Sequence, residues 1–218
     1  MQVYKLSDPG SLGPRSHPWT SAVSDSAFRY IDFQAQPELI RSSIEDLQDW
    51  GAYPSTEIFY QLLEWLNGPE SVFESNDCAF NGPTRQVTQG VDKRFECSGR
   101  LMILYRELAL NTVVEAVHSL TQAFAGRLSQ RDPDFAWGAV GVTSVEVRFR
   151  TLPGPVEAQR SQQLMLSFWA WGDDENETMA SLDRTLSNLA GVLRDLSAKI
   201  AAAGIVNLSH GLADWVDE

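Results

Sequence analysis

Carboxylates are the most plentiful reactive groups in this chain, and the segment Glu74-Ser75-Asn76-Asp77 places two of them close together. Two neighbouring carboxyl groups could coordinate a metal ion or act as a general acid and a general base. The same short polar residues are also typical of a turn in which side chains hydrogen-bond to the backbone. We favour the turn, and we predict no metal, no cofactor and no catalytic residue.

Other catalytic patterns do not emerge from the sequence. His17, His118 and His210 lie in three different contexts and lack the spacing of a zinc site, as do Cys78 and Cys97. Cys97 falls on the inward face of an expected strand, which indicates an inert thiol. There is no glycine-rich phosphate loop and no serine in a G-x-S-x-G context. The sequence favours a protein without catalytic activity, and an enzyme whose carboxylates converge through the fold alone stays open.

Negative charge dominates the chain and is concentrated near its N-terminal third. The formal net charge is −12, which argues against binding to nucleic acid or to an anionic membrane surface. The stretch from Asp32 to Asp77 contains a single base, Arg41. Its acids are Asp32, Glu38, Glu45, Asp46, Asp49, Glu57, Glu64, Glu70, Glu74 and Asp77. This stretch is either a solvated surface or a face that attracts a basic protein partner. For the second case the candidate contact residues are Glu45, Asp49 and Glu57.

Two tryptophans and two arginines form a second candidate surface. Trp169 and Trp171 alternate with apolar residues along one expected strand, and Arg148 and Arg150 face outward on the strand before it. If the register is suitable, two indoles and two guanidinium groups share one face of the sheet. Such a face is either covered, with internal cation–π contacts, or exposed as a binding surface.

Two strands followed by an amphipathic helix are expected twice. The first copy runs from Val72 through the apolar run 101–105 to a helix near Asn111, and the second runs from Val140 to a helix after Glu175. The last helix has the clearest apolar stripe, which is Leu182, Leu186, Leu189, Leu193, Leu196 and Ile200. The order predicts a single α+β domain over residues 1–218, with a mainly antiparallel sheet built from two ββα units and two N-terminal helices packed with it.

Several finer features follow from local pattern. We expect a strand over 28–33, a helix with Pro37 in its first turn that continues to Gly51, and a second helix after Tyr53-Pro54. A short strand over 72–75 is expected to lead into a long loop over 76–93 and then a strand over 94–107, in which Gly99 marks a bulge.

The ends of the chain read as an extended arm over residues 1–22, with a short strand at Gln2–Leu6, and a tail over 205–218. The sequence shows neither a signal peptide nor an apolar run of spanning length, so we expect a soluble cytoplasmic protein with reduced thiols.

Three functions remain open at this point. The first is an acidic, non-enzymatic cytoplasmic protein that masks a basic protein partner, as an immunity or antitoxin-type protein does. The second is an enzyme or small-ligand-binding protein with an aromatic-lined pocket. The third is a structural or assembly component that forms homo-oligomers, such as a homodimer, through the tryptophan-rich face.

Overall fold

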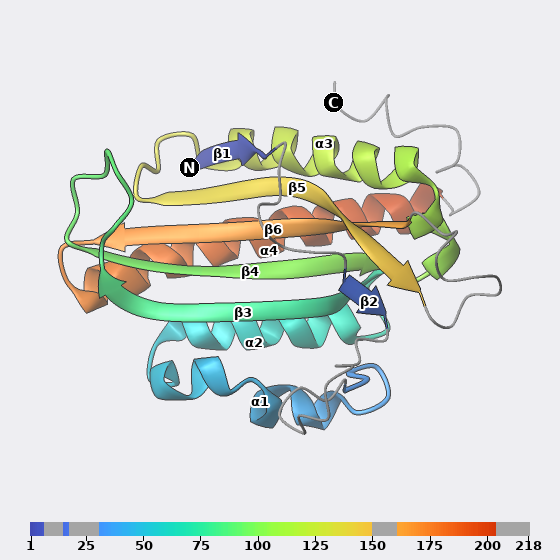
Figure 1. Ribbon diagram of the computed structural model, residues 1–218, viewed down its shortest axis with the longest axis horizontal. Helices are drawn as coiled ribbons and strands as arrows, with labels where there is room; N and C mark the ends of the chain where they lie inside the picture. The colour runs from blue at the N-terminus through green and yellow to red at the C-terminus, as the bar shows by residue number, and fades with distance from the viewer. Residues whose placement is uncertain (7–14, 18–30, 150–160, 204–218) are drawn as a thin grey trace.

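The computed structural model describes residues 1–6, 15–17, 31–149 and 161–203, and it shows an α+β fold with one mixed sheet and no barrel (Figure 1). The strands are β1 (Gln2–Lys5), β2 (Arg15–His17), β3 (Phe73–Arg85), β4 (Phe95–Tyr105), β5 (Gly138–Phe149) and β6 (Ser161–Gly172). The helices are η2 (Pro37–Leu39), α1 (Ile40–Ser43), η3 (Glu45–Trp50), α2 (Pro54–Asn67), η4 (Leu108–Thr112), α3 (Val114–Arg131) and α4 (Glu175–Ala203). The expected α+β class is confirmed.

The sheet has the order β1-β5-β6-β4-β3, and β2 also pairs with β5. The pairs β3–β4, β4–β6 and β5–β6 are antiparallel, whereas β1 and β2 both run parallel to β5. The long strands therefore have the antiparallel arrangement that was expected, and the two short N-terminal strands make the sheet mixed. In chain order, one hairpin precedes α3 and one precedes α4.

The main core lies between the sheet and the helices α2, α3 and α4, which cover one of its faces (Figure 1). Leu164, Leu166 and Phe168 of β6 point to this side and are fully buried. The apolar stripe of α4 is buried in the same cluster. Period-two alternation in β6 and the seven-residue repeat of α4 thus meet in one layer, as a helix lying on a sheet requires.

Two smaller clusters lie on the opposite face of the sheet. Val145 packs with Met102 and Met165, while Val147 and Phe149 pack with Leu104. The alternation in β5 was expected to turn Val145, Val147 and Phe149 toward the helices. These side chains are buried, but on the other face of the sheet. The residues of β5 that pack toward the helices are Val140 and Val142.

The strand β3 is much longer than the expected strand over 72–75. It extends through Arg85, so most of the region 76–93 that was expected to be a loop belongs to the sheet. Its register shifts between Ser75 and Asp77 and again between Asn81 and Thr84. Each shift inserts an unpaired residue and interrupts the period-two pattern, which is why the strand was missed.

Gly99 does not mark a bulge. Its pairing continues in register with Phe80 on one side and Phe168 on the other. A Cβ atom at Gly99 would lie 2.3 Å from the ring of Phe168 and 2.6 Å from the carbonyl oxygen of Ala79. The glycine is needed because the Phe168 ring passes directly over the backbone.

The first expected N-terminal helix is broken into η2, α1 and η3. Ile44 interrupts it with φ −101° and ψ 83°, although Ile40, Ile44 and Leu47 are all buried as helical spacing predicted. The strand expected over 28–33 is also wrong where it can be described. Asp32 Oδ1 accepts hydrogen bonds from the backbone N–H groups of Gln34 and Ala35, which makes a turn. Residues 28–30 lie outside the described part of the chain.

Candidate functional site

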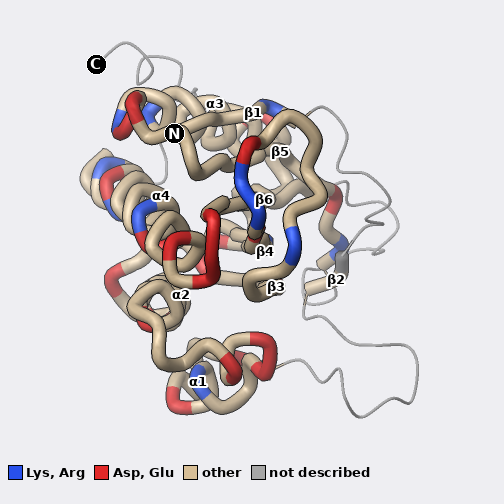
Figure 2. Tube along the Cα trace, turned by 90° about the vertical axis from the view of Figure 1, so that its left-hand side faces the viewer, with Lys and Arg blue, Asp and Glu red and all other residues tan. Residues whose placement is uncertain are grey.

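Acidic residues gather on η2, α1 and η3 (residues 37–50), which we call the acidic helical layer (Figure 2). Glu38, Glu45 and Asp49 are exposed, and none of them forms an ion pair with another described residue. The buried apolar residues of this layer, Ile40, Ile44 and Leu47, face inward, and Glu38, Glu45 and Asp49 are left at the surface. The structure thus brings together Glu45 and Asp49, two of the three acids expected to contact a partner.

The acidic helical layer is fixed against the edge strand β3. Leu47 is completely buried, and the backbone N–H of Phe80 donates to Asp46 Oδ2 at 3.4 Å. The ring of Trp50 lies against Gly82, where a Cβ atom would come within 2.0 Å of it. The exposed carboxylates are therefore presented by a docked segment, which reduces the ordering cost of binding.

Glu57 differs from the other two predicted contact residues. The Arg41 guanidinium reaches both carboxylate oxygens of Glu57, at 2.7 and 2.8 Å, and its Nε lies 2.7 Å from Glu64 Oε1. The hydrogen bonds from Arg41 lower the pKa of Glu57 to about 2, and these carboxylates in turn raise the pKa of Arg41. Arg41 thus neutralises much of the charge on α2, whereas Glu45 and Asp49 on η3 form no ion pair with any residue that the structure describes.

The two tryptophans of β6 are covered to different degrees. Trp171 is 4% exposed, and its indole Nε1 donates to Glu96 Oε2 at 2.8 Å. The Thr88 hydroxyl, in the segment between β3 and β4, donates to the same oxygen. Trp169 is half-buried, and its ring and the side chain of Leu6, which follows β1, both lie close to Gly141. Trp171 is therefore part of the folded interior.

The structure does not bring Arg148 next to the two tryptophans. Trp169 pairs with Ala139 at one end of β5, whereas Arg148 lies one residue beyond Val147, which pairs with Ser161 at the other end. Alternation also places Arg148 on the opposite face from Val147. Arg148 is exposed and forms an ion pair with Glu146, with 3.4 Å between Nε and Oε1. Arg150 lies outside the described residues.

Glu74 and Asp77 lie in β3, with separate partners, and not in the expected turn. His17 Nε2 is 3.0 Å from Glu74 Oε1, and the Gln34 amide donates to the other oxygen of Glu74. Asp77 Oδ2 lies 3.2 Å from the Arg100 guanidinium. Within the described ranges, no group of three or more His, Cys, Asp or Glu residues is arranged to hold a metal ion.

The thiol of Cys97 is buried in the core, as its strand position predicted. Burial raises its pKa to about 12, because a thiolate would lose its hydration there. Cys97 is therefore protonated at neutral pH and is a poor nucleophile.

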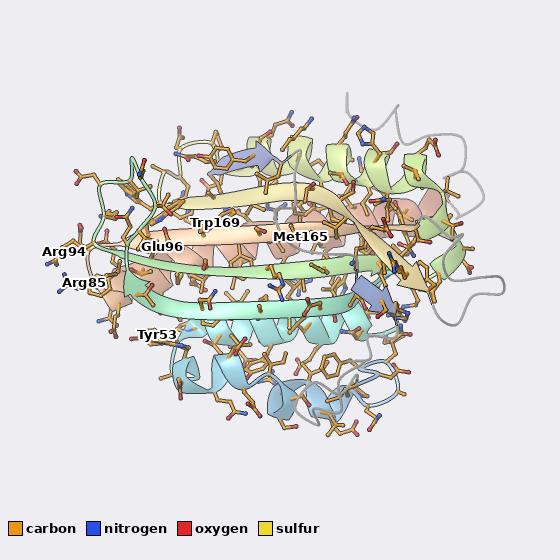
Figure 3. All side chains as sticks on the ribbon, in the orientation of Figure 1. Tyr53, Arg85, Arg94, Glu96, Met165 and Trp169 are labelled. Atoms are coloured by element: carbon orange, nitrogen blue, oxygen red, sulfur yellow. The ribbon has the colours of Figure 1, made fainter. Side chains whose placement is uncertain are left out.

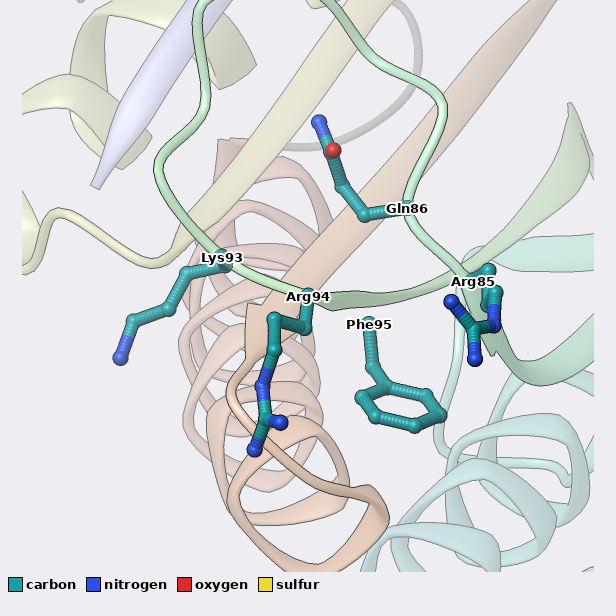
Figure 4. A pocket seen from close by; sticks show the side chains of 5 residues that line it. All are labelled: Arg85, Gln86, Lys93, Arg94 and Phe95. Carbon is teal, nitrogen blue, oxygen red and sulfur yellow. The ribbon is translucent and has the colours of Figure 1, made fainter.

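A basic pocket lies where β3 ends and β4 begins, and sequence reasoning missed it (Figure 4). It has a volume of about 270 Å³ and is lined by Arg85, Gln86, Lys93, Arg94 and Phe95. Arg85 and Arg94 lie at the same end of the sheet as Glu96 (Figure 3). These residues were placed in or beside a loop, so nothing in the sequence indicated that the hairpin would bring Arg85 and Arg94 together.

Comparison of the chain with protein-family models, with curated proteins and with solved structures finds no match. In the described part of the chain, no helix is both long and apolar enough to cross a membrane. We therefore infer function from the contacts, charges and burial of the protein's own residues.

Proposed function

We propose that this protein is a non-enzymatic binding protein that takes a basic protein partner on the acidic helical layer. The observation that carries the proposal is the set of exposed carboxylates of Glu38, Glu45 and Asp49, which lack ion-pair partners among the described residues. Arg41, the base nearest to them in the sequence, is already held by Glu57 and Glu64. A cation from another molecule would supply the missing counter-charge.

Charge complementarity of this kind acts mainly on the rate of association. Opposite charges steer two proteins together, and salt weakens the effect because the screening length is about 8 Å at physiological ionic strength. A docked layer also avoids the entropy cost of ordering a mobile segment. A cytoplasmic protein that masks a basic toxin, as immunity and antitoxin-type proteins do, is the specific form of the proposal.

The test reverses two charges on the layer. We expect the double variant Glu45→Lys/Asp49→Lys to associate several-fold more slowly with a basic partner captured by the wild-type protein from source-cell extract. Glu107→Lys/Glu115→Lys is the matched control, since it changes the net charge by the same amount as Glu45→Lys/Asp49→Lys. Its two sites are exposed and lie just before η4 and in α3. Association rates measured by surface biosensor at low and high salt should differ between the two variants only at low salt.

Two results would contradict the proposal. The first is a captured partner that carries no net positive charge. The second is a basic partner whose association with the Glu45/Asp49 variant matches that with the Glu107/Glu115 variant at every salt concentration. Circular dichroism spectra and melting curves of both variants verify that they fold as the wild type does.

A further inference from the structure

The backbone around the basic pocket is held firmly on both sides. Arg85 is the last residue of β3 and pairs with Phe95, the first residue of β4, which pairs in turn with Gly172 of β6. The carbonyl oxygen of Arg94 accepts from Gln86 N–H at 2.9 Å, and Arg94 N–H donates to the carbonyl oxygen of Gly172 at 3.2 Å. The backbone of the residues that line the pocket is therefore held in place by hydrogen bonds at the end of the sheet.

Arg85 and Arg94 differ in charge balance from the third cation of the pocket. Lys93 is neutralised by Asp173 and Glu177, at 2.8 and 2.7 Å, and its Nζ lies over the Trp137 ring. Neither Arg85 nor Arg94 lies within ion-pair distance of an acidic residue in the described portion of the chain. Two positive charges thus remain at the pocket of a protein whose formal net charge is −12.

Most other arginines whose side chains the structure describes have clear intramolecular partners. Arg41, Arg100, Arg131, Arg148 and Arg184 contact carboxylates. Two more are used differently: Arg106 donates to backbone carbonyl groups, and Arg194 lies over the Trp65 ring. Arg85 and Arg94 are therefore unusual among the arginines that the structure describes, because no described carboxylate lies within ion-pair distance of either.

The third element of the pocket is an aromatic ring. Phe95 is half-buried, and its ring lies between the side chains of Arg94 and Arg85 in Figure 4. A ring beside two guanidinium groups offers an apolar surface to one part of a ligand and charged hydrogen bonds to another. The pocket volume of about 270 Å³ is near the lower limit for small-molecule sites, so the ligand has to be small.

From these features we infer that the pocket binds a small organic phosphate that carries a planar ring. The phosphoryl group lies against Arg85 and Arg94, and the ring packs against Phe95. Two guanidinium groups match a phosphate dianion better than a single carboxylate, because together they supply two positive charges and several N–H donors. The pocket shares no residue with the acidic helical layer, so this inference and the proposed function stand or fall separately.

Phenyl phosphate is the probe, with inorganic phosphate and benzoate as comparisons, all measured by NMR titration at pH 7.5. At that pH the probe is a dianion, since the second pKa of a phosphate monoester is about 6. We expect saturable binding with the order phenyl phosphate, then inorganic phosphate, then benzoate. Arg85→Gln and Arg94→Gln should each weaken phenyl phosphate binding roughly tenfold, as expected for loss of a charged hydrogen-bond donor.

Two further variants separate the parts of the site. Phe95→Leu should weaken binding of phenyl phosphate several-fold and leave inorganic phosphate unchanged. Lys199→Gln removes one exposed charge from α4, away from the pocket, and should change neither affinity. The inference is overturned if phenyl phosphate does not saturate, if both arginine variants bind it as the wild type does, or if benzoate binds equally well.

Discussion

At the scale of single residues, the contact between Trp171 and Glu96 is the most informative. Glu96 is 9% exposed and accepts hydrogen bonds from the Trp171 indole and the Thr88 hydroxyl. A carboxylate with so little access to water depends on such donors, because an unsatisfied buried polar group is costly. Trp171 therefore both fills space in the interior and supplies a hydrogen-bond donor to the buried carboxylate of Glu96.

Replacement of Trp171 by alanine should lower the free energy of unfolding by about 3–5 kcal/mol, the usual range for large-to-small changes in a core. Trp171→Phe keeps an aromatic ring and removes the N–H, so its cost should be smaller, about 1–3 kcal/mol. Urea denaturation of the three proteins gives both values. If alanine left stability nearly unchanged while self-association disappeared, Trp171 would be an interface residue and our assignment would be wrong.

Sequence pattern predicted some of these residues well. Alternation along 162–171 correctly separated Leu164, Leu166 and Phe168 from the two tryptophans. It could not show that Trp171 contacts Glu96, because these two residues meet only through the pairing of β4 with β6. The same limit hid the pairing of Arg85 with Phe95, which depends on a register that the sequence does not encode locally.

At the scale of elements, Arg41 is the link between α1 and α2. It is held by Glu57 and Glu64 from the neighbouring helix, with about half of the Arg41 and Glu57 side chains exposed. An ion pair so open to solvent contributes little to stability, about 0.2–1 kcal/mol at most. The ion pair between Arg41 and Glu57 is therefore easier to detect through the pKa of Glu57 than through the stability of the fold.

The Glu57 carboxyl should titrate below its ordinary pKa of 4.5 in the wild type, and in Arg41→Gln its pKa should rise toward 4.5 without reaching it, because the hydrogen bond from Gln61 remains. Because the pKa of Glu57 is lower in the folded protein, the contact stabilises the fold above about pH 4.5, and this contribution is lost as the pH falls through the lowered pKa. Side-chain carboxyl chemical shifts followed by NMR measure both values. An unchanged Glu57 pKa in Arg41→Gln would show that the ion pair does not form in solution.

The elements were predictable where their pattern is regular. The stripe from Leu182 to Ile200 repeats without interruption, and α4 follows it along its whole length. The strand β3 was missed because two register shifts break its alternation. The segment from Leu39 to Gly51 has helical spacing of its buried residues, yet the backbone at Ile44 leaves the helical region. The periodicity therefore predicted correctly which residues are buried, but it was wrong in predicting one unbroken helix.

At the scale of the whole molecule, the formal net charge of −12 should oppose compactness through self-repulsion. Raising NaCl from about 20 to about 200 mM shortens the screening length, so the melting temperature should rise by about 1–4 °C. Glu45→Lys/Asp49→Lys should show a smaller rise, since it removes part of the repulsion. Differential scanning calorimetry in a salt series provides the test, and a melting temperature that falls with salt would contradict it.

The α+β class could be predicted because long strands and long helices alternate along the chain. The mixed character of the sheet could not. The short strand expected at Gln2–Leu6 is confirmed as β1, whereas β2 has only three residues and was missed. The parallel pairing of both with β5 depends on the position of a strand that follows much later in the sequence.

The pairing of β1 and β2 with β5 also has a consequence for the order of assembly. Gln2 pairs with Ala139 and Arg15 with Val147, so β1 and β2, which are synthesised long before β5, find their partners only after β5 has been made. Contacts between such distant segments form slowly, and an unpaired strand edge invites pairing with other chains in the meantime. The outer edge of β5 is thus among the last parts of the sheet to be closed.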